Sequence, residues 1–203
     1  MVFWICEYGL EIIIVNDGST DNSLQICEEY KLLDKRIQLI NQQNSGVSVA
    51  RNNGIKLASG DYVFFVDGDD WIETDAFEKV FTLINKNDLL CFSYFKDYFD
   101  NRAIRKLGLD GEFDASFLKR RITGLLEQEL KDPSQLDSLG TVWGKVYKTA
   151  IIKEHAITFK DLKDIGTWED GLFNLEYLNF SKSVYIMDQP FYHYRKTNQN
   201  SLT

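Results

Sequence analysis

Residues 61–71 read DYVFFVDGDDW, an apolar run that ends directly in a cluster of acidic residues. Asp61 to Val66 predicts a buried strand, because a short run that is apolar on both faces fits the middle of a covered sheet. Asp67, Asp69 and Asp70 then place three carboxylates within four positions. Like charges this close destabilise one another unless a cation compensates them. The stretch therefore predicts a buried sheet and a charged site at the end of one of its strands.

The segments before this stretch alternate in the same way between strand and helix. Leu10 to Val15 (LEIIIV) and Arg36 to Ile40 (RIQLI) predict two more strands. A helix is expected after each, the first ending at Leu33 and the second covering Val47 to Leu57. This alternation predicts an α/β fold, with a Rossmann-like, mostly parallel sheet that has helices on both faces. Ligands bind such sheets outside the carboxyl ends of the strands, where Asp17 and the acidic cluster fall.

The alternation continues beyond the acidic cluster and weakens after Tyr98. From residue 74 onward we expect six further elements, namely helices at Thr74–Ile84, Phe113–Leu130 and Glu169–Phe180, strands at Asp88–Phe95 and Ser183–Met187, and a loop at Asp132–Gly140. The sequence contains no internal repeat and no obvious linker. Residues 1–203 are therefore expected to form a single domain.

The composition is that of a globular protein with few soft metal ligands. Of its 203 residues 44% are apolar, and the formal net charge of -8 argues against non-specific binding to nucleic acid. Cys6, Cys27 and Cys91 are far apart and form no C-x-x-C motif, which argues against a disulfide framework or a zinc site and fits a reducing cytoplasm. His155 and His193 are the only histidines, so an imidazole-rich metal site is disfavoured.

Three acidic segments each have a structural and a functional interpretation. Asp67 and Asp69 form either a turn that caps the next helix or the ligands of Mg²⁺ or Mn²⁺, which prefer oxygen. Asp17 either caps a helix or accepts a hydrogen bond from the base of a nucleotide. Glu169 and Asp170 either stabilise a helix N-terminus through its dipole or supply a general base for an acceptor hydroxyl. The residues alone leave these alternatives open.

Two basic residues have a similar pair of interpretations. Arg51 lies on the expected helix that leads towards the acidic cluster, and Lys145 lies in the run Trp143-Gly144-Lys145. Each is either a solvated surface residue or a group that orients an aspartate or contacts a diphosphate. Composition does not separate the two interpretations.

Five segments, taken in order, resemble the family 2 glycosyltransferases with the GT-A fold. They are EIIIVNDGSTDNS (Glu11–Ser23), NSGVSVARNNGIKLASGDYVFFVDGDDW (Asn44–Trp71), VWGKVYK (Val142–Lys148), WEDGLFN (Trp168–Asn174) and FYHYRKTNQNS (Phe191–Ser201). Each motif is weak by itself, but five in this order and spacing are specific. The resemblance extends from Leu10 to the C-terminus and implies a single GT-A domain in which residues 100–203 form the acceptor-side half.

The resemblance implies roles for residues on the donor side of such a site. Asp17 would contact the nucleotide base. Asp67 and Asp69 match the D-x-D motif, whose first aspartate typically meets the ribose side and whose second meets the metal. His193 lies where some relatives place a further metal or diphosphate contact.

The resemblance also implies the catalytic residues. Asp170 matches the usual catalytic base, with Glu169 beside it, and Arg51 and Lys145 are assigned to the substrate. The implied reaction inverts the anomeric carbon. In it Asp170 deprotonates the acceptor hydroxyl, while Mn²⁺ or Mg²⁺ stabilises the charge on the departing diphosphate.

The N-terminus departs from the family pattern. Members begin with an apolar strand and a helix before the strand that matches Leu10 to Val15, and Met1 to Gly9 match neither. We therefore expect an N-terminally truncated domain that lacks its central first strand. A sheet without that strand has open edges, which would favour strand exchange or a homodimer.

The implied partners are a nucleotide-sugar donor, with UDP as the nucleotide, and a saccharide or lipid-linked acceptor in cell-surface polysaccharide biosynthesis. One alternative is a non-catalytic remnant that binds a nucleotide or a partner protein. Another is a sugar nucleotidyltransferase, which would need a Gly-rich, Arg-bearing loop near the N-terminus that this sequence lacks. Neither a P-loop nor a G-x-G-x-x-G motif occurs.

The expected location is the cytoplasm. Met1 to Cys6 is apolar but far shorter than the ~20 residues that span a bilayer, and no basic segment precedes it. Peripheral attachment to the inner face of the cell membrane is compatible with the sequence.

Overall fold

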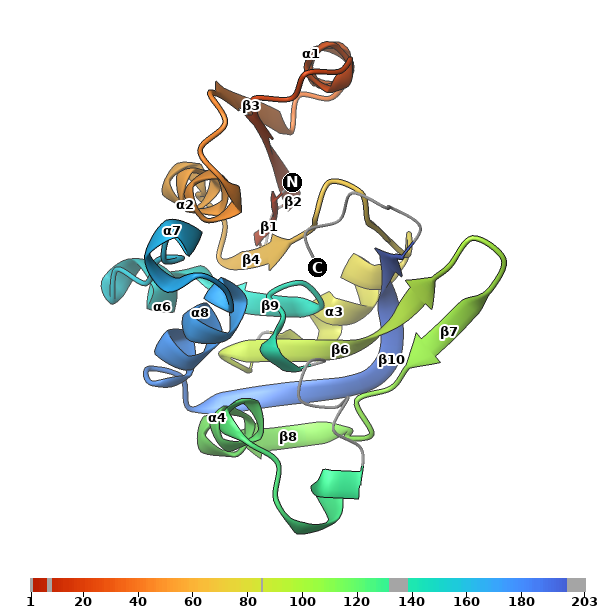
Figure 1. Ribbon diagram of the computed structural model, residues 1–203, viewed down its shortest axis with the longest axis vertical. Coiled ribbons are helices and arrows are strands. Elements are labelled where there is room, and N and C mark those ends of the chain that lie inside the picture. The colour runs from red at the N-terminus through yellow and green to blue at the C-terminus, as the bar shows by residue number, and fades with distance from the viewer. Residues whose placement is uncertain (1, 7–8, 85, 132–138, 197–203) are drawn as a thin grey trace.

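The computed structural model describes residues 2–6, 9–84, 86–131 and 139–196. Its strands are β1 (Val2–Cys6), β2 (Gly9–Asp17), β3 (Ile37–Gln42), β4 (Tyr62–Phe65), β5 (Trp71–Ile72), β6 (Leu89–Asp97), β7 (Arg102–Arg105), β8 (Gly111–Asp114), β9 (Lys145–Lys148) and β10 (Ser183–Arg195). They form a single sheet in the order β3-β2-β1-β4-β9-β6-β10-β5, with β7 paired to β6 and β8 to β10 (Figure 1).

The main strands of the sheet run in one direction, as the α/β interpretation predicts. β2 pairs with β3 and β6 with β10 in parallel. β1 lies antiparallel between β2 and β4, and β9 lies antiparallel between β4 and β6. Strands β2, β3, β4, β6 and β10 therefore share one direction, and their carboxyl ends meet at one edge of the sheet.

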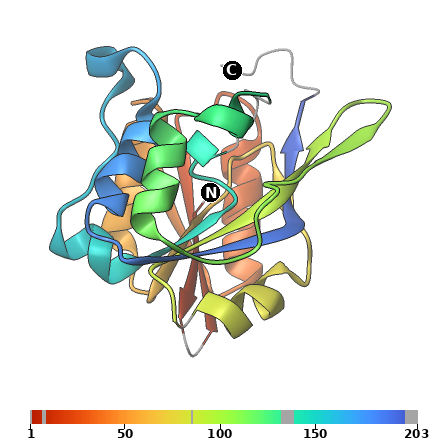
Figure 2. The same ribbon diagram turned by 90° about the horizontal axis from the view of Figure 1, so that it is seen from below.

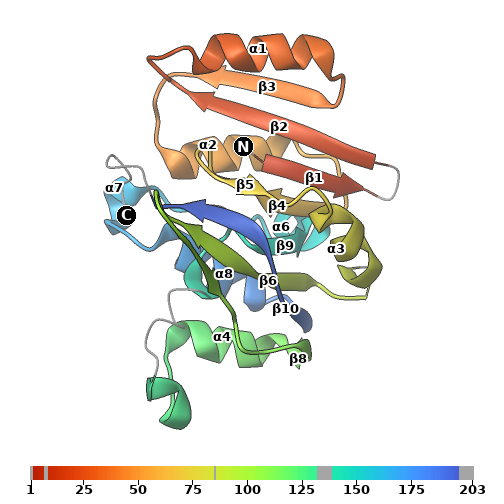
Figure 3. The ribbon, with the colours of Figure 1, turned by 90° about the vertical axis from the view of Figure 1, so that its right-hand side faces the viewer.

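Strand β1 corrects the expectation of a missing central strand. Its residues pair with β2 from Val2 opposite Ile13 to Cys6 opposite Gly9, and with β4 from Val2 opposite Phe65 to Ile5 opposite Tyr62. The chain thus fills the position between β2 and β4 with a strand of its own, in the antiparallel sense (Figure 3). The open edge that favoured strand exchange is closed, and the homodimer expectation loses that support.

Helices cover both faces of the sheet (Figure 2). One face carries α2 (Val47–Leu57), α4 (Ala115–Thr123), α6 (Thr149–Glu154) and α8 (Glu169–Leu178), and the other carries α1 (Ser23–Leu33) and α3 (Ala76–Ile84). Each face has its own apolar core. The core under α8 centres on Phe65, whose ring makes edge contacts with Tyr147, Phe159 and Phe173 at centroid distances of 5.8, 5.3 and 5.9 Å.

Several expected elements are confirmed and others are wrong at identifiable points. The helix at Val47–Leu57 has the expected bounds. The helix expected at Phe113–Leu130 is interrupted, because β8 takes its first residues and Gly124 ends α4 before a short 3₁₀ helix at Glu127–Lys131. The last strand does not end at Met187 but continues to Arg195, and its pairing with β6 shifts register on both sides of Pro190. Proline has no N–H to donate to a neighbouring strand, so inside a sheet it is found at irregularities of this kind. Most of the loop expected at Asp132–Gly140 lies outside the described residues.

Two further elements complete the description. The short helix α7 (Leu162–Ile165) precedes α8. Within the described ranges, none of the helices has the length and apolar character needed to cross a membrane.

Hydrogen exchange followed by NMR tests the place of β1. Because β1 has a hydrogen-bonded neighbour on each side, the amides of Phe3 to Ile5 should be protected to nearly the same degree as those of Val63 and Phe64 in β4. The edge strand β3, which pairs with β2 alone, is the internal control and should show faster exchange at alternate residues. Rapid exchange in both β1 and the facing amides of β4 would contradict this placement.

Candidate functional site

The carboxylate of Asp17 joins the end of β2 to the start of α2. Its Oδ1 accepts hydrogen bonds from Gln42 Nε2 and the Ser45 N–H, both at 2.8 Å, and its Oδ2 accepts from the Gly46 N–H at 2.9 Å. Gly18 follows with φ 71°, and an added Cβ there would lie 2.6 Å from the Asn44 nitrogen. Asp17 therefore orders the turn before α2, the helix that carries Arg51.

The acidic loop after β4 is held by its third carboxylate. Asp70 accepts hydrogen bonds from the Tyr192 hydroxyl at 2.6 Å and from the Arg195 N–H at 2.8 Å. The Tyr192 hydroxyl in turn accepts from the Asp67 N–H at 3.1 Å. Burial raises the pKa of Asp70 to about 6, although these two donors lower it. Asp70 thus fixes the loop to β10, while Asp67 turns its carboxylate to Arg51.

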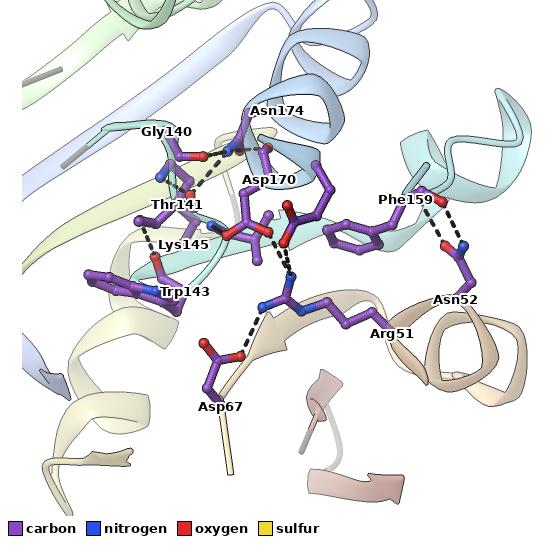
Figure 4. Close-up of polar contacts among 12 residues, drawn as sticks. Arg51, Asn52, Asp67, Gly140, Thr141, Trp143, Lys145, Phe159, Asp170 and Asn174 are labelled. Atoms are coloured by element: carbon purple, nitrogen blue, oxygen red, sulfur yellow. Dashed lines mark hydrogen bonds and ion pairs between the residues drawn. The ribbon is translucent and has the colours of Figure 1, made fainter. Parts of the chain in front are cut away.

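Arg51 brings the acidic loop and helix α8 together (Figure 4). Its guanidinium lies 2.9 Å from Asp67 Oδ1, 2.6 Å from Asp170 Oδ1 and 3.7 Å from Glu169 Oε1. The residue is only 8% exposed, and its guanidinium lies 5.2 Å from the centre of the Phe159 ring. Burial alone would lower the pKa of Arg51, but the three carboxylates together raise it, so the side chain remains a cation. The structure therefore gathers three predicted site residues, all carboxylates, around a fourth, the buried cation Arg51.

A buried amide behind Asp170 was not predicted from the sequence. Asn174 Nδ2 donates to the carbonyl oxygens of Gly140, Thr141 and Asp170, at 2.7, 3.0 and 2.9 Å. Its Oδ1 accepts from the Tyr147 hydroxyl at 2.8 Å. A signal for it exists in the sequence, because Asn174 is the one polar residue among Phe173, Asn174, Tyr177 and Leu178 on the buried face of α8.

Lys145 and His193 do not lie where their assigned roles require. Lys145 was expected at the substrate, but it is 2% exposed and its Nζ donates to the Thr141 carbonyl. His193 was expected at the metal, but its ring is also 2% exposed and is stacked between Trp71 and Phe95. Both ring nitrogens of His193 already have carboxylate partners, which are Asp97 at 2.7 Å and Glu73 at 3.0 Å.

The donor set fits a cation that shares its ligands with a substrate. Among the residues that the structure describes, no three His, Cys, Asp or Glu side chains form a cluster that could hold a metal ion by themselves. Three carboxylates, those of Asp67, Glu169 and Asp170, nevertheless lie around the single guanidinium of Arg51. Such a set suits Mg²⁺ or Mn²⁺, which use one or two carboxylates together with substrate phosphates and water. A separate cavity of about 780 Å³, lined in part by Gly60, Tyr62 and Lys153, contains none of the predicted site residues.

Replacing the bridging guanidinium should loosen the whole site. Arg51→Met leaves three carboxylates without their common cation, so the free energy of unfolding should fall by about 2 kcal/mol, less than for a fully buried pair because the carboxylates are partly exposed. Urea denaturation of the variant and the parent measures this difference in the free energy of unfolding. The matched control is Lys56→Met on the same helix, whose exposed side chain should change stability by less than about 0.5 kcal/mol. Equal stability of the two variants would contradict the bridge.

Comparisons with known proteins show the family of this chain. The family model described as Glycosyl transferase family 2 matches residues 5–140. The uncharacterized glycosyltransferase EpsJ of Bacillus subtilis (strain 168) is 35% identical over 196 residues, which are 96% of this chain and 54% of EpsJ. The poly(ribitol-phosphate) beta-N-acetylglucosaminyltransferase TarP of Staphylococcus aureus (strain N315) is 32% identical over 183 residues, which are 87% of this chain and 50% of TarP.

The solved structures show the same fold. A structure of S. aureus TarS 1-349 in complex with UDP-GlcNAc superimposes with a TM-score of 0.71 at 22% identity, covering 94% of this chain and 50% of that one. The chain thus spans about half the length of these relatives. The match to the family model covers most of the sequence and includes the residues of the Asp67 loop and Arg51, and on this ground the chain belongs to glycosyl transferase family 2.

Proposed function

We propose that this chain is an inverting glycosyltransferase domain that moves a sugar from a UDP-sugar to a hydroxyl of a saccharide or lipid-linked acceptor. The observation that carries the proposal is the Arg51 bridge, which places the D-x-D aspartate Asp67 and the acidic pair Glu169-Asp170 on the same guanidinium. The relative TarP, a poly(ribitol-phosphate) beta-N-acetylglucosaminyltransferase, and the TarS structure bound to UDP-GlcNAc support a UDP-sugar donor and a role in cell-surface polymer biosynthesis.

In this proposal the donor lies along the carboxyl ends of β2 and β4. Asp17 ends β2 and would meet the nucleotide base, and Asp67, two residues after the end of β4, would lie on the ribose side. Asp69 and Asp67 would hold Mn²⁺ or Mg²⁺. The cation would supply positive charge for the departing diphosphate.

Asp170 is the proposed general base. Its Oδ1 meets Arg51 and its Oδ2 accepts the Val142 N–H at 3.1 Å, so each oxygen keeps a lone pair for an acceptor hydroxyl. The side chain is 19% exposed, which leaves an approach for the acceptor. Inversion in a single displacement needs a general base and a cation but no covalent nucleophile on the enzyme, and carboxylates can supply the base and the ligands of the cation. We further propose that the protein works in the cytoplasm, at the inner face of the membrane where a lipid-linked acceptor is presented.

Removing the proposed metal ligand should abolish metal-dependent donor binding. Asp69→Ala is expected to lower the affinity for UDP in Mn²⁺ to the level seen in EDTA, as measured by calorimetry. Asp75→Ala, which removes an exposed carboxylate just before α3, is the control and should bind UDP normally. Metal-dependent binding by Asp69→Ala would reassign the ligand.

Removing the proposed base should separate binding from transfer. Asp170→Asn is expected to bind UDP as the parent does but to lose about 10²-fold or more in turnover, the range for loss of a general base. Glu176→Gln, on the same helix and paired with Lys160 at the surface, is the matched control. UDP release from UDP-GlcNAc reports turnover, and unchanged turnover in Asp170→Asn would show that another group takes the proton.

A further inference from the structure

Lys145 is a buried cation that the proposed reaction does not use. It begins β9, one residue after Gly144, and its side chain is enclosed by the core. An ammonium in such surroundings is costly unless its hydrogen-bonding capacity is met. Burial lowers the pKa of Lys145, while the charges of Cys91 and Asp170 oppose that shift. Packing alone therefore does not explain why a lysine occupies this buried position.

The hydrogen bonds of Lys145 lead to the proposed base in two steps. Its Nζ donates to the carbonyl of Thr141. The next residue, Val142, donates its N–H to Asp170 Oδ2 at 3.1 Å. Because the carbonyl of Thr141 and the N–H of Val142 belong to one planar peptide unit, fixing the carbonyl also fixes the direction of the N–H.

The same peptide unit has a second, neutral donor. Asn174 Nδ2 reaches the Thr141 carbonyl at 3.0 Å (Figure 4). The Asn174 side chain is itself held by the Tyr147 hydroxyl, which donates to its Oδ1. A charged donor forms a shorter and stronger hydrogen bond than an amide does. Lys145 is therefore the stronger of the two donors on this carbonyl.

We propose that Lys145 is a positioning residue that aims the Val142 N–H at Asp170 by holding the Thr141 carbonyl. The effect on turnover rests on the proposed function, whereas the orientation of the Val142 N–H rests on the hydrogen bonds alone. Arg51 contacts Asp170 Oδ1 from α2. On the other side, the Lys145 relay, which consists of the hydrogen bond from Lys145 Nζ to the Thr141 carbonyl and the one from the Val142 N–H to Asp170, holds Oδ2 from β9. The carboxylate is thus oriented from two sides, and the acceptor meets it in one orientation.

The test compares Lys145→Met with Lys148→Met. Both residues lie on β9, but the Lys148 side chain is 46% exposed and points to Asp88. Lys145→Gln, which keeps a neutral donor, is a second variant at the same position. The readouts are amide exchange by NMR, which needs no activity, and the rate of UDP release from UDP-GlcNAc in Mn²⁺, together with its KM.

Lys145→Met should raise the exchange rate of the Val142 amide about tenfold, the effect of losing roughly one hydrogen bond, while Val146 and Tyr147 in β9 remain protected. Turnover should fall about tenfold with KM for UDP-GlcNAc unchanged, because the base is displaced and the donor site is intact. In Lys145→Gln, both the exchange rate of the Val142 amide and the turnover should lie between those of Lys145→Met and the parent. In Lys148→Met, both should match the parent.

The outcomes separate this inference from the proposed function. Unchanged exchange at Val142 in Lys145→Met overturns the positioning role, whatever the activity. A general rise in exchange across β9 overturns it as well, since Lys145 would then only support the fold. Faster exchange confined to Val142 supports the relay, even if the parent protein releases no UDP from UDP-GlcNAc, a result that would count against the proposed function instead.

Discussion

The arrangement of the site depends on one buried guanidinium. Arg51 joins Asp67, 16 residues later in the chain, to Asp170, 119 residues later. The two aspartates belong to different halves of the domain, the first following β4 and the second opening α8. Carboxylates that converge in this way would repel one another without a shared cation. The guanidinium makes their convergence stable, and its fork of donors can serve several carboxylates at once.

Other interactions around Arg51 serve to hold its partners in place. Asp17 organises the turn that starts α2, and the Asn52 side chain exchanges two hydrogen bonds of 2.8 Å with the backbone of Phe159, whose ring packs on Arg51. Asp70 ties the acidic loop to β10 through Tyr192. Of the three carboxylates in the D-x-D-D stretch, one is therefore structural. That division explains how a cluster of like charges can persist in a folded protein, and in the proposed function the other two carboxylates would hold the cation.

Much of the framework could be predicted from the sequence, because it is encoded locally. The alternation of apolar strands and amphipathic helices predicts the α/β architecture. It also places Asp17 at the end of β2 and Asp67 just after β4, and Asp67 is one of the carboxylates that meet Arg51. Strand β1 could not be predicted, since its place between β2 and β4 depends on long-range pairing in a direction that no local pattern specifies. Lys145 was assigned to the substrate and His193 to the metal through the resemblance, but the structure buries both side chains and pairs them within the protein. Asn174 could have been suspected as a polar residue on an apolar helix face.

The most direct measurement is a calorimetric titration of UDP into the 203-residue chain, first with Mn²⁺ and then with EDTA. We expect binding in Mn²⁺ that is lost in EDTA, because Asp17, Asp67 and Asp69 would form a donor site that needs a shared cation to hold the diphosphate. Absence of binding in Mn²⁺ by the folded protein would contradict the account. Binding of equal strength in EDTA would contradict the role given to the acidic loop.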